Sequence, residues 1–510
     1  MLSISVADVP LPYIILAGVV FYVVGLGIYR LYVSPLASIP GPKLAALTQW
    51  YETYYEMCTT PTGQFMFHYR ELHKKYGPII RISPHEVHIQ DSQFFHVFYS
   101  NTKPWDKPRY LQHRFSNDNG LFPTPSHEIH KHRRAALNPF FSKRRIFDFS
   151  PVMQAQMNRL CDRLNHEYRG TNKVLRLDWM FACYVADTVV GYCFENKYSW
   201  LEAPDFRCDF AEAMNSLLEN VHLVTQFPWV ARILNAMPKD ILAKLNPDMQ
   251  IVNDFNKEMR RQIVSILDNQ HSYMKESKSQ TVFRALLESN LPPQELSPLR
   301  LQNEATTIIG AGVETTRWAL TVGSFHIINN PEILGKLRAE LEAAIPDPQS
   351  MPSLERLEKL PYLDACVQEC CRLSYGTAQR GHRTSEHITL QYGSYVIPPG
   401  FTISMDNYAI SHDEAIFPDS HSFKPERWLN SDIAPDGKPL RSYMVSFGRG
   451  TRQCIGMPLA LAEMYIVMAN LYRKFEFDLY ETDRSAVDCA SDAFAPRPKP
   501  GTLGVRAFVK

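Results

Sequence analysis

The sequence has little net charge, no glycosylation sequon and no low-complexity tract, and each absence excludes a class of protein. Its 54 Lys and Arg residues balance 53 Asp and Glu residues, so the chain has no nucleic-acid-binding footprint. The ten cysteines have no zinc-like paired spacing, which fits a body that faces the reducing cytosol. A hydrophobic content of 45%, with no internal repeat or polar linker, favours one large folded domain.

One segment, from Leu11 to Tyr29, departs from the pattern of a soluble protein. Its nineteen residues carry no charge, and a helix of that length would reach about 28 Å, close to the apolar thickness of a bilayer. A cleaved signal peptide is the alternative, but the apolar run is longer than a signal core and no basic residue precedes it. We therefore expect a transmembrane helix over about residues 11–31, within an anchor of residues 1–33.

The charges beside this segment predict its orientation. Asp8 precedes it, whereas Arg30 and Lys43 follow it, and by the positive-inside rule the rest of the chain faces the cytosol. Residues 34–48 are rich in proline, which cannot continue a helix, and they predict a semi-rigid hinge. Residues 49–510 then form the folded body.

The body has mainly helical periodicity. The pattern predicts a mainly α fold with a small antiparallel β region, as one domain. Asn329-Asn330-Pro331 supplies a cap and a first-turn proline for one helix. The expected helices are 152–168, 175–194, 249–268, 298–328 and 332–344, and the expected strands are 79–82, 87–89 and a hairpin within 388–397.

The strongest chemical signal is the loop Phe447-Gly448-Arg449-Gly450-Thr451-Arg452-Gln453-Cys454-Ile455-Gly456, which precedes an apolar helical run. Cys454 would lie at the N-terminus of that helix, which favours a thiolate. Gly450 and Gly456 permit unusual dihedral angles and a close approach to a flat partner, and Arg452 could pair with a carboxylate on that partner. For the other nine cysteines an inert thiol is the better interpretation.

Five positions of this loop match the pattern Phe-X-X-Gly-X-Arg-X-Cys-X-Gly, and the chain resembles the cytochrome P450 superfamily from its Pro-Gly-Pro segment to the C-terminus. The resemblance implies a P450 fold, a haem b cofactor and Cys454 as the axial thiolate ligand of the haem iron. It also implies that Arg452, Phe447 and Gly448 contact the haem.

Glu369-Cys370-Cys371-Arg372 matches the family's Glu-X-X-Arg motif. Residues three apart share a helix face, so the two charges can pair. A surface ion pair of little consequence would be the ordinary interpretation. By resemblance, Glu369 and Arg372 lie in the core instead, joined by Arg427 of a later Pro-Glu-Arg segment, and have a structural role behind the haem.

Gly310 and Gly312 lie inside the longest expected helix, where each costs about 1 kcal/mol relative to alanine. Close helix packing could explain them. By resemblance, Ala311-Gly312-Val313-Glu314-Thr315-Thr316 is instead the kink where dioxygen binds. Thr315 would then donate a hydrogen bond to bound dioxygen, and Glu314 would help to relay protons from solvent. These two are the predicted catalytic residues.

Basic residues in two segments are candidates for the haem propionates. In the family a Trp and an Arg four residues apart contact one propionate. Arg134 occupies the Arg position, and His130 replaces the Trp, which departs from the pattern. Arg383 matches the Arg of the strand that follows Glu-X-X-Arg. For Arg133 a solvated basic face is the preferred interpretation.

The resemblance implies an NADPH- and dioxygen-dependent monooxygenase of the endoplasmic reticulum that hydroxylates or epoxidises an apolar small molecule. The chain has no Gly-X-Gly-X-X-Gly fingerprint, so electrons should come from an NADPH–cytochrome P450 reductase, whose acidic face could meet Lys131, Arg133 and Arg449. We expect a monomer. A haem-thiolate isomerase or dehydratase without dioxygen, and a non-enzymatic haem-binding protein, stay open as alternatives, and the Glu314–Thr315 pair disfavours both.

Two stretches resemble fungal secondary-metabolism members of the superfamily. They run from His127 to Ser142 and from Met237 to Met249, the second containing Leu245-Asn246-Pro247. The resemblance extends to the trichodiene-oxygenase-like group. It implies a terpenoid or polyketide substrate, by family analogy alone.

Overall fold

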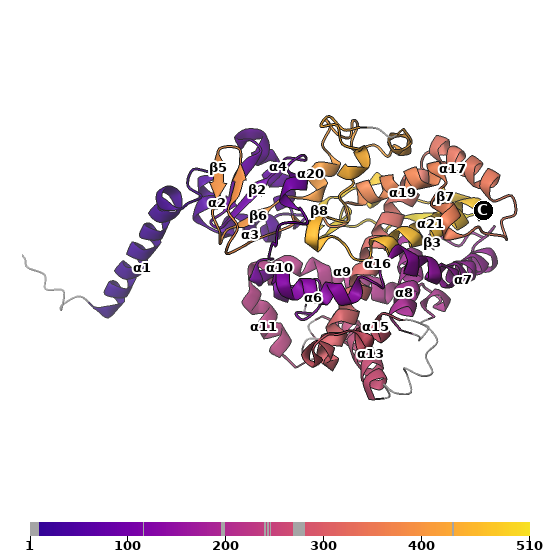
Figure 1. Ribbon diagram of the computed structural model, residues 1–510, viewed down its shortest axis with the longest axis horizontal. Helices are drawn as coiled ribbons and strands as arrows, with labels where there is room; N and C mark the ends of the chain where they lie inside the picture. The colour runs from indigo at the N-terminus through magenta and orange to yellow at the C-terminus, as the bar shows by residue number, and fades with distance from the viewer. Residues whose placement is uncertain are drawn as a thin grey trace, which may run out of the picture.

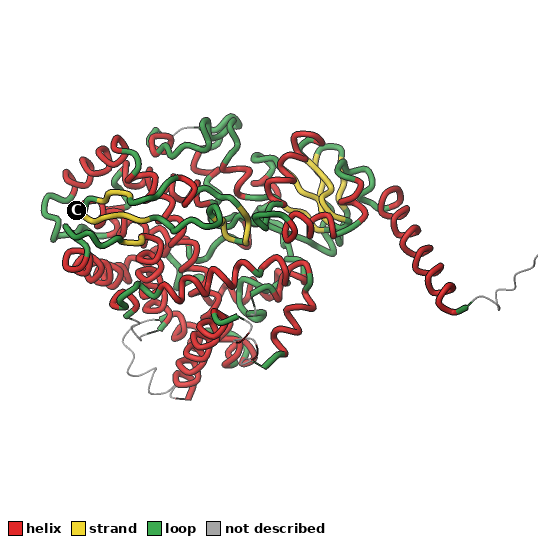
Figure 2. The backbone as a smooth tube through the Cα atoms, turned by 180° about the vertical axis from the view of Figure 1, so that it is seen from behind, coloured by secondary structure: helices red, strands yellow, loops and turns green. Residues whose placement is uncertain are grey.

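The computed structural model describes residues 10–115, 117–194, 199–238, 241, 244, 246–268, 281–430 and 433–510. Asp8 and Leu245, which the sequence interpretation used, lie outside the described residues. Helices make up most of the body, and a smaller lobe with short strands lies between this helical part and the N-terminal helix (Figures 1 and 2).

The helices follow the expected periodicity, with two differences at their starts. The expected helix 152–168 begins earlier and contains Pro151. Pro151 has no N–H for the carbonyl of Phe147, and the Ser150 hydroxyl donates to that carbonyl instead, at 2.8 Å. The helix expected to begin at Leu175 begins at Leu177, because residues 175–176 form a strand. The helices are α1 Leu11–Ile28, α2 Lys43–Leu47, α3 Trp50–Thr53, α4 Phe65–Tyr76, α5 Phe95–Phe98, α6 His127–Leu137, α7 Lys143–Glu167, α8 Leu177–Cys193, α9 Cys208–Glu219, α10 Val221–Gln226, α11 Pro228–Ala236, α13 Asp248–Asp268, α15 Val282–Glu288, α16 Pro298–Ile328, α17 Pro331–Ala344, α18 Leu354–Leu357, α19 Pro361–Ser374, α20 Asn407–Ser411 and α21 Met457–Lys474.

The strands are short and form small separate sheets. The expected hairpins are present as the antiparallel pairs β1–β2 and β4–β5. One ladder differs from the expected antiparallel pattern, because β6 pairs with β2 in parallel. The sheets are β1-β2-β6, β3-β10-β7, β4-β5 and β8-β9, built from β1 Ile79–Ser83, β2 Glu86–Ile89, β3 Leu175–Arg176, β4 Leu390–Tyr392, β5 Tyr395–Ile397, β6 Thr402–Ser404, β7 Phe477–Leu479, β8 Ser491–Ala493, β9 Ala495–Arg497 and β10 Arg506–Val509.

The long helix α16 lies at the centre of the helical core. It contacts α8, α13 and α19, and α21 closes the same core from the C-terminal side. Helix α8 is apolar on nearly every face and is buried along almost its whole length, as expected for a helix surrounded by other elements. Helices of the core therefore pack against α16 on more than one side.

The N-terminal helix extends away from the body (Figure 1). No residue of α1 is buried, and Leu11–Val33 is the one span among the described residues that is long and apolar enough to cross a membrane. The proline-rich stretch after it lies against the small lobe. Leu36 and Ile39 are buried there, and Arg81 N–H donates to the carbonyl of Pro40 at 2.7 Å. The boundaries of anchor, hinge and catalytic domain stay predictions.

Candidate active site

The cysteine loop has a backbone that only glycine permits at two positions. Gly448 and Gly450 have φ angles of +64° and +74°, and a Cβ on Gly450 would lie 2.5 Å from the carbonyl oxygen of Tyr99. The expectation of an unusual dihedral at Gly456 was wrong, because its φ is −80° and it caps α21. Cys454 N–H donates to the carbonyl of Phe447 at 2.8 Å, which holds the loop closed.

Cys454 lies on an interior surface of the protein. Its side chain is exposed, yet burial raises the pKa of its thiol, so protein atoms surround the space that the sulfur faces. Backbone N–H groups of Gly456 and Met457 and the charge of Arg134 lower the pKa, but by less than burial raises it. The predicted thiolate at Cys454 stays a prediction. A metal ion that binds a thiol deprotonates it outright.

The predicted propionate-binding arginines come together beside this loop. Arg134 Nη1 donates to the carbonyl of Gln453, next to the cysteine, at 2.6 Å. Arg452 donates to two backbone carbonyls of residues 124–125, both at 2.6 Å. Arg383 donates to the carbonyl of His382 at 2.8 Å. The charge of Arg383 also contributes to lowering the pKa of Arg452 to about 9, after burial, so the two guanidiniums are neighbours.

A fourth cation, Lys107, belongs to this cluster, and the sequence analysis did not find it. Lys107 Nζ donates to a backbone carbonyl at 2.7 Å, and burial and the charges of Arg452 and Arg383 hold its pKa well below the usual range. Burial and the charges of Arg452, Lys107 and Arg134 lower the pKa of His130 to about 2, so its imidazole is neutral. A lone lysine before a proline carries no motif, and only its place in the fold identifies it.

These cations form no salt bridge with any carboxylate in the part of the chain that the structure describes. All four are partly exposed, and neighbouring cations that are largely removed from solvent without counter-charges are unfavourable. A dianionic group in this space would supply the missing charge, and the two propionates of a haem fit that requirement. The fit rests on the donors present: one thiol, four cations and a neutral imidazole in one interior region. These donors are Cys454, Lys107, Arg134, Arg383, Arg452 and His130.

Some residues of helix α16 are exposed or partly exposed although the helix lies in the middle of the core. Ala311 is exposed and Thr315 is partly exposed, whereas Val313 and Thr316 are buried. The Thr315 hydroxyl donates to the carbonyl of Ala311 at 2.9 Å. A Cβ on Gly312 would lie 3.1 Å from Val189 of α8, so close packing accounts for that glycine. The helix is continuous through this segment.

Glu314 lies in a buried ion pair with two arginines. Arg317, one turn later in α16, lies 2.7 Å from its carboxylate, and Arg497 of β9 lies 3.0 Å away. Burial opposes the charge, but the two guanidiniums outweigh it and hold the pKa of Glu314 below its usual range. Glu314 is therefore an ionised carboxylate, and its predicted role in proton relay stays a prediction.

The Glu-X-X-Arg pair lies deep in the core. Glu369 and Arg372 have fully buried side chains and form two hydrogen bonds, of 2.7 and 2.8 Å. Arg427 Nε donates to Glu369 at 3.0 Å and Trp428 Nε1 at 2.9 Å. The remaining N–H groups of Arg372 donate to backbone carbonyls of residues 411, 420 and 422. The structural role given to the three charged residues stays a prediction.

Arg133 differs from its expected place on a solvated basic face. It donates to Glu295 at 2.7 and 2.9 Å, and its side chain is 12% exposed. A planar guanidinium and a carboxylate match in such a two-bond pair. Arg133 therefore contributes little positive charge to the surface.

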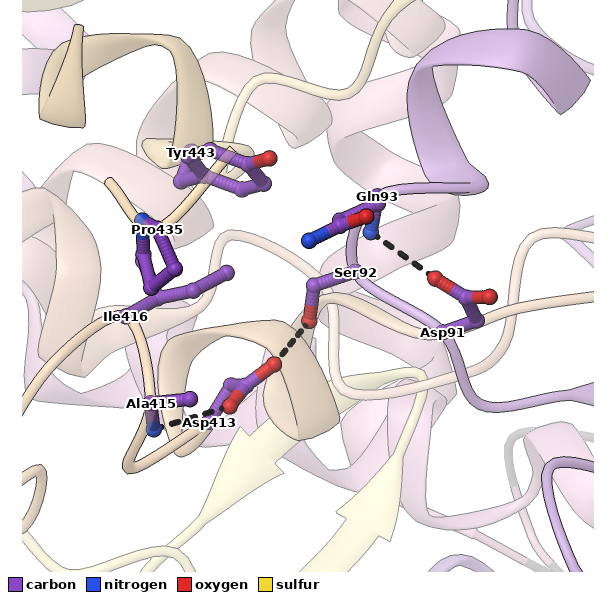
Figure 3. Close-up of a pocket in the computed structure, with 8 residues that line it drawn as sticks. All are labelled: Asp91, Ser92, Gln93, Asp413, Ala415, Ile416, Pro435 and Tyr443. Atoms are coloured by element: carbon purple, nitrogen blue, oxygen red, sulfur yellow. Dashed lines mark hydrogen bonds between the residues drawn. The ribbon is translucent and has the colours of Figure 1, made fainter. Parts of the chain in front are cut away.

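A separate pocket of about 200 Å³ opens in the small lobe (Figure 3). Ser92 Oγ donates to Asp413 across it at 2.6 Å. It shares no residue with the site around Cys454. Its lining residues are Asp91, Ser92, Gln93, Asp413, Ala415, Ile416, Pro435 and Tyr443.

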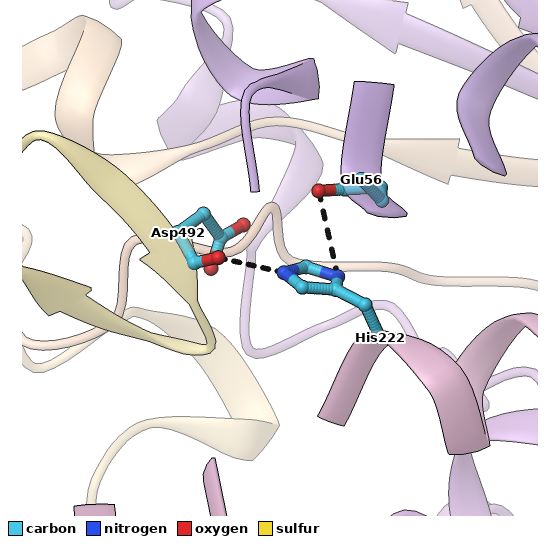
Figure 4. A group of neighbouring side chains, drawn as sticks. All are labelled: Glu56, His222 and Asp492. Atoms are coloured by element: carbon cyan, nitrogen blue, oxygen red, sulfur yellow. Dashed lines mark hydrogen bonds and ion pairs between the residues drawn. The ribbon is translucent and has the colours of Figure 1, made fainter. Parts of the chain in front are cut away.

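A buried histidine lies between two acidic residues where α10 meets β8 (Figure 4). His222 Nε2 lies 2.6 Å from the backbone carbonyl of Asp492, and its Nδ1 lies 3.4 Å from Glu56. Their ligand atoms are close enough for a metal ion, but Arg380 lies 4.0 Å from Glu56 and its charge disfavours a cation. We interpret the group as a hydrogen-bonded network.

Comparison with known proteins identifies relatives over nearly the whole chain. The family model described as Cytochrome P450 matches residues 49–505. A cytochrome P450 monooxygenase of Eupenicillium brefeldianum is 45% identical, covering 95% of this chain and 96% of that protein. Another, of Sordaria araneosa, is 42% identical over 96% of both. A tryptophan 6-hydroxylase of Fusarium equiseti is 38% identical over 98% of this chain and 97% of that protein.

Proposed function

The chain belongs to the cytochrome P450 family and is a haem-thiolate monooxygenase; we propose that it is membrane-anchored and draws its electrons from a separate NADPH-dependent reductase. The observation that carries the site assignment is the cluster of partly exposed cations without carboxylate partners beside Cys454. In this proposal the Cys454 sulfur would bind the haem iron as a thiolate. Lys107, Arg134, Arg383 and Arg452 hold the propionates, and His130 adds a neutral N–H donor.

The bound haem supplies dioxygen activation, and a thiolate ligand favours O–O cleavage by donating electron density. Gly448 and Gly450 keep the loop backbone close to its neighbours, so that Cys454 faces the interior surface. Phe447 packs against the core and fixes the other end of the loop through its carbonyl. The loop thus positions the sulfur before any ligand arrives.

Thr315 of α16 would control a proton of the reaction. Its hydroxyl proton is committed to the carbonyl of Ala311, so rotation about χ1 is required before it can donate elsewhere. Glu314 would have to separate from Arg317 or Arg497 before it could accept a proton, because both guanidiniums stabilise its charge. In the proposed relay, Thr315 donates and Glu314, once released, carries protons from solvent.

The proposed substrate is a small apolar molecule of fungal secondary metabolism. A terpenoid or polyketide agrees with the resemblance in sequence, and the tryptophan 6-hydroxylase named above shows that a relative hydroxylates an aromatic ring. Partly exposed rings of Phe115, Phe122 and Phe494 pack on one another near α16. Such rings would cover an apolar substrate.

The proposed electron donor is NADPH–cytochrome P450 reductase at the endoplasmic reticulum, with the body in the cytosol and α1 in the bilayer. Lys131 is exposed and Arg449 is partly exposed, so both could meet an acidic partner. Arg133 no longer belongs to this basic surface, because Glu295 neutralises it. We propose that the enzyme acts as a monomer.

The test uses purified full-length protein. The reduced protein should give the red-shifted carbon-monoxide band of a thiolate-bound haem, and Cys454→Ser should abolish it. Cys58→Ser is the matched control and should keep the band, because Cys58 is also exposed but is distant from Cys454 in the sequence. With reductase, NADPH should drive product formation. A surviving band in Cys454→Ser would remove Cys454 as the ligand, and turnover independent of NADPH would contradict the proposed donor.

A further inference from the structure

A buried arginine near the three phenylalanines has no carboxylate partner. Arg114 is 8% exposed, and no carboxylate of the described chain lies at salt-bridge distance from it. Its Nη1 donates to the side-chain oxygen of Gln379, and its Nε is buried without an acceptor. A buried charge of this kind is costly unless an anion compensates it. The arrangement therefore indicates a binding position for an anionic group.

Arg114 lies at the edge of the propionate cluster and not within it. Burial lowers its pKa to about 10, and the titratable groups that act on that pKa are Tyr110, Asp492 and Arg380. None of these is a predicted propionate ligand. Arg380 is paired with Glu52 and Glu86, both at less than 3 Å. Arg114 therefore has different neighbours from the cations beside Cys454. The one link is Lys107, whose pKa the charge of Arg114 helps to lower.

Nearby carboxylates already have other partners. Asp492 accepts the N–H of Phe494 at 2.6 Å, and the charge of His222 acts strongly on it. Tyr110 carries no charge, because burial raises its pKa well above the usual value. An anion beside Arg114 must therefore come from outside the described part of the protein.

Aromatic rings surround the guanidinium. Its carbon lies 5.4 Å from the ring centre of Phe115 and 5.1 Å from that of Phe494. Phe494 contacts both Phe115, at 4.9 Å, and Phe122, at 5.7 Å. One charged donor beside a group of apolar rings matches a ligand with an anionic end and an apolar body.

The segment that carries Arg114 packs on the helix that carries Thr315. Asn117 Nδ2 donates to Thr307 Oγ1 of α16 at 2.7 Å, and Thr307 precedes Thr315 by about two turns, or roughly 12 Å. Ala378 N–H donates to the carbonyl of Phe494 at 3.0 Å, which fixes Gln379 and the phenylalanines to one another. A molecule several carbon atoms long could reach from Arg114 towards Thr315.

We propose that the substrate is a carboxylic acid whose carboxylate binds Arg114 and whose apolar body lies against the phenylalanine rings. This proposal rests on the proposed function, because it names the substrate class of that site. A guanidinium binds a carboxylate through two parallel hydrogen bonds, and Gln379 keeps it oriented. Acids of aromatic, terpenoid or polyketide type all meet the requirement, whereas neutral hydrocarbons do not.

The experiment compares acids with their neutral esters in the full-length holoenzyme. The probes are indole-3-propionate and laurate, each beside its methyl ester, and the dissociation constant is read from the shift of the haem absorption band. The wild type should bind at least one acid tenfold or more tightly than its ester. Arg114→Gln should weaken acid binding at least tenfold and leave ester binding unchanged, and Arg114→Lys should keep part of the preference.

Three outcomes would overturn the proposal. The first is a wild type that binds no probe acid better than its ester. The second is an acid preference that persists in Arg114→Gln. The third is haem loss in Arg114→Gln with normal haem in Arg114→Lys, which would place Arg114 on a propionate. If Arg114→Gln does not fold, the wild-type and Arg114→Lys measurements decide. The carbon-monoxide band and NADPH-driven turnover of the wild type test the proposed function separately.

Discussion

Thr315 is partly exposed and Cys454 is exposed, whereas Glu314 and Thr316, on either side of Thr315, are buried. The two come from distant parts of the chain, and each has a local backbone that sets its direction. For Thr315 this is the hydrogen bond to Ala311, and such i−4 bonds are known to bend helices. Rotation about χ1 of Thr315 would therefore be enough to turn the hydroxyl away from Ala311, without a shift of α16.

Thr315→Ala tests that role. The variant should keep haem and substrate, because neither is held by the hydroxyl, and it should still consume NADPH through the reductase. Peroxide should rise and product per NADPH should fall, about tenfold or more if the hydroxyl makes a typical general-acid contribution. Thr306→Ala is the matched control on the same helix, since its hydroxyl bonds outward to Asn256. An efficiency equal to wild type would remove Thr315 from the mechanism.

The bounds of helices and strands agree with the sequence prediction where a local pattern determines them. The bounds of α16 and the hairpin strands follow from periodicity and turn residues. Pro151 did not end its helix, because Ser150 replaces the missing donor. Residues 175–176 left the helical pattern because β10 pairs with them. The pairing with β10 has no signal within a short window of sequence, whereas Ser150, next to Pro151, is a local one.

The ion pair of α19 with the segment η7 (Pro425–Trp428) is predicted to hold these elements together. Arg372→Ala would leave Glu369 buried with a weaker set of partners, at a cost of about 3–5 kcal/mol. We expect a lower unfolding midpoint and poorer haem retention, with normal turnover for each haem that remains. Arg338→Ala is the control, because its partner Glu476 is 63% exposed and such pairs contribute little. Wild-type stability and haem content in Arg372→Ala would refute the structural role.

The network of Glu56, His222 and Asp492 should make stability depend on pH. Burial raises the pKa of Glu56 from 4.5 to about 8, so the folded state holds a proton that the unfolded state releases. Its stabilising effect is present below pH 4.5 and is lost as pH rises through about 8, with a slope of at most about 1.4 kcal/mol per pH unit. The pKa values of His222 and Asp492 are also raised and act in the same direction.

Glu56→Gln isolates this effect, since glutamine cannot ionise. The difference in unfolding free energy between Glu56→Gln and wild type should grow between pH 5 and 8 in favour of the variant. Chemical denaturation across that range measures it. Glu71→Gln, at an exposed residue paired with Lys74, should follow the wild type. Parallel curves for Glu56→Gln and wild type would exclude Glu56 as the titrating group.

Across the whole molecule, motifs predicted the site residues that have a fixed short spacing in the sequence, and only the fold identified the others. Cys454, Arg452 and Arg134 could be found because each belongs to a local pattern of the family. Lys107 and Arg114 could not, because their significance depends on which distant charges surround them. Glu314 was found, but its partner Arg497 was not, for the same reason.

Removing residues 1–33 should separate the membrane function of the chain from its folding. The shortened protein should appear in the soluble fraction with haem content and carbon-monoxide band unchanged, because α1 buries no residue against the body. Arg81 would lose one bond, to the carbonyl of Arg30, but keep those to residues 83 and 84. Loss of haem on truncation would show that the segment belongs to the fold.

The length of α1 also bears on which membrane suits it. The α-helical part of the Leu11–Val33 span, eighteen residues, extends about 27 Å, which matches the hydrocarbon thickness of the endoplasmic reticulum bilayer, about 27 Å. The helical turn that follows contains the charged Arg30. The plasma membrane is thicker by about 5 Å, and a short span there must thin the lipid at a cost of a fraction of a kcal/mol for each Å. Hydrophobic mismatch would thus retain the protein in thin membranes, and an α1 lengthened by one apolar turn should shift towards thicker ones.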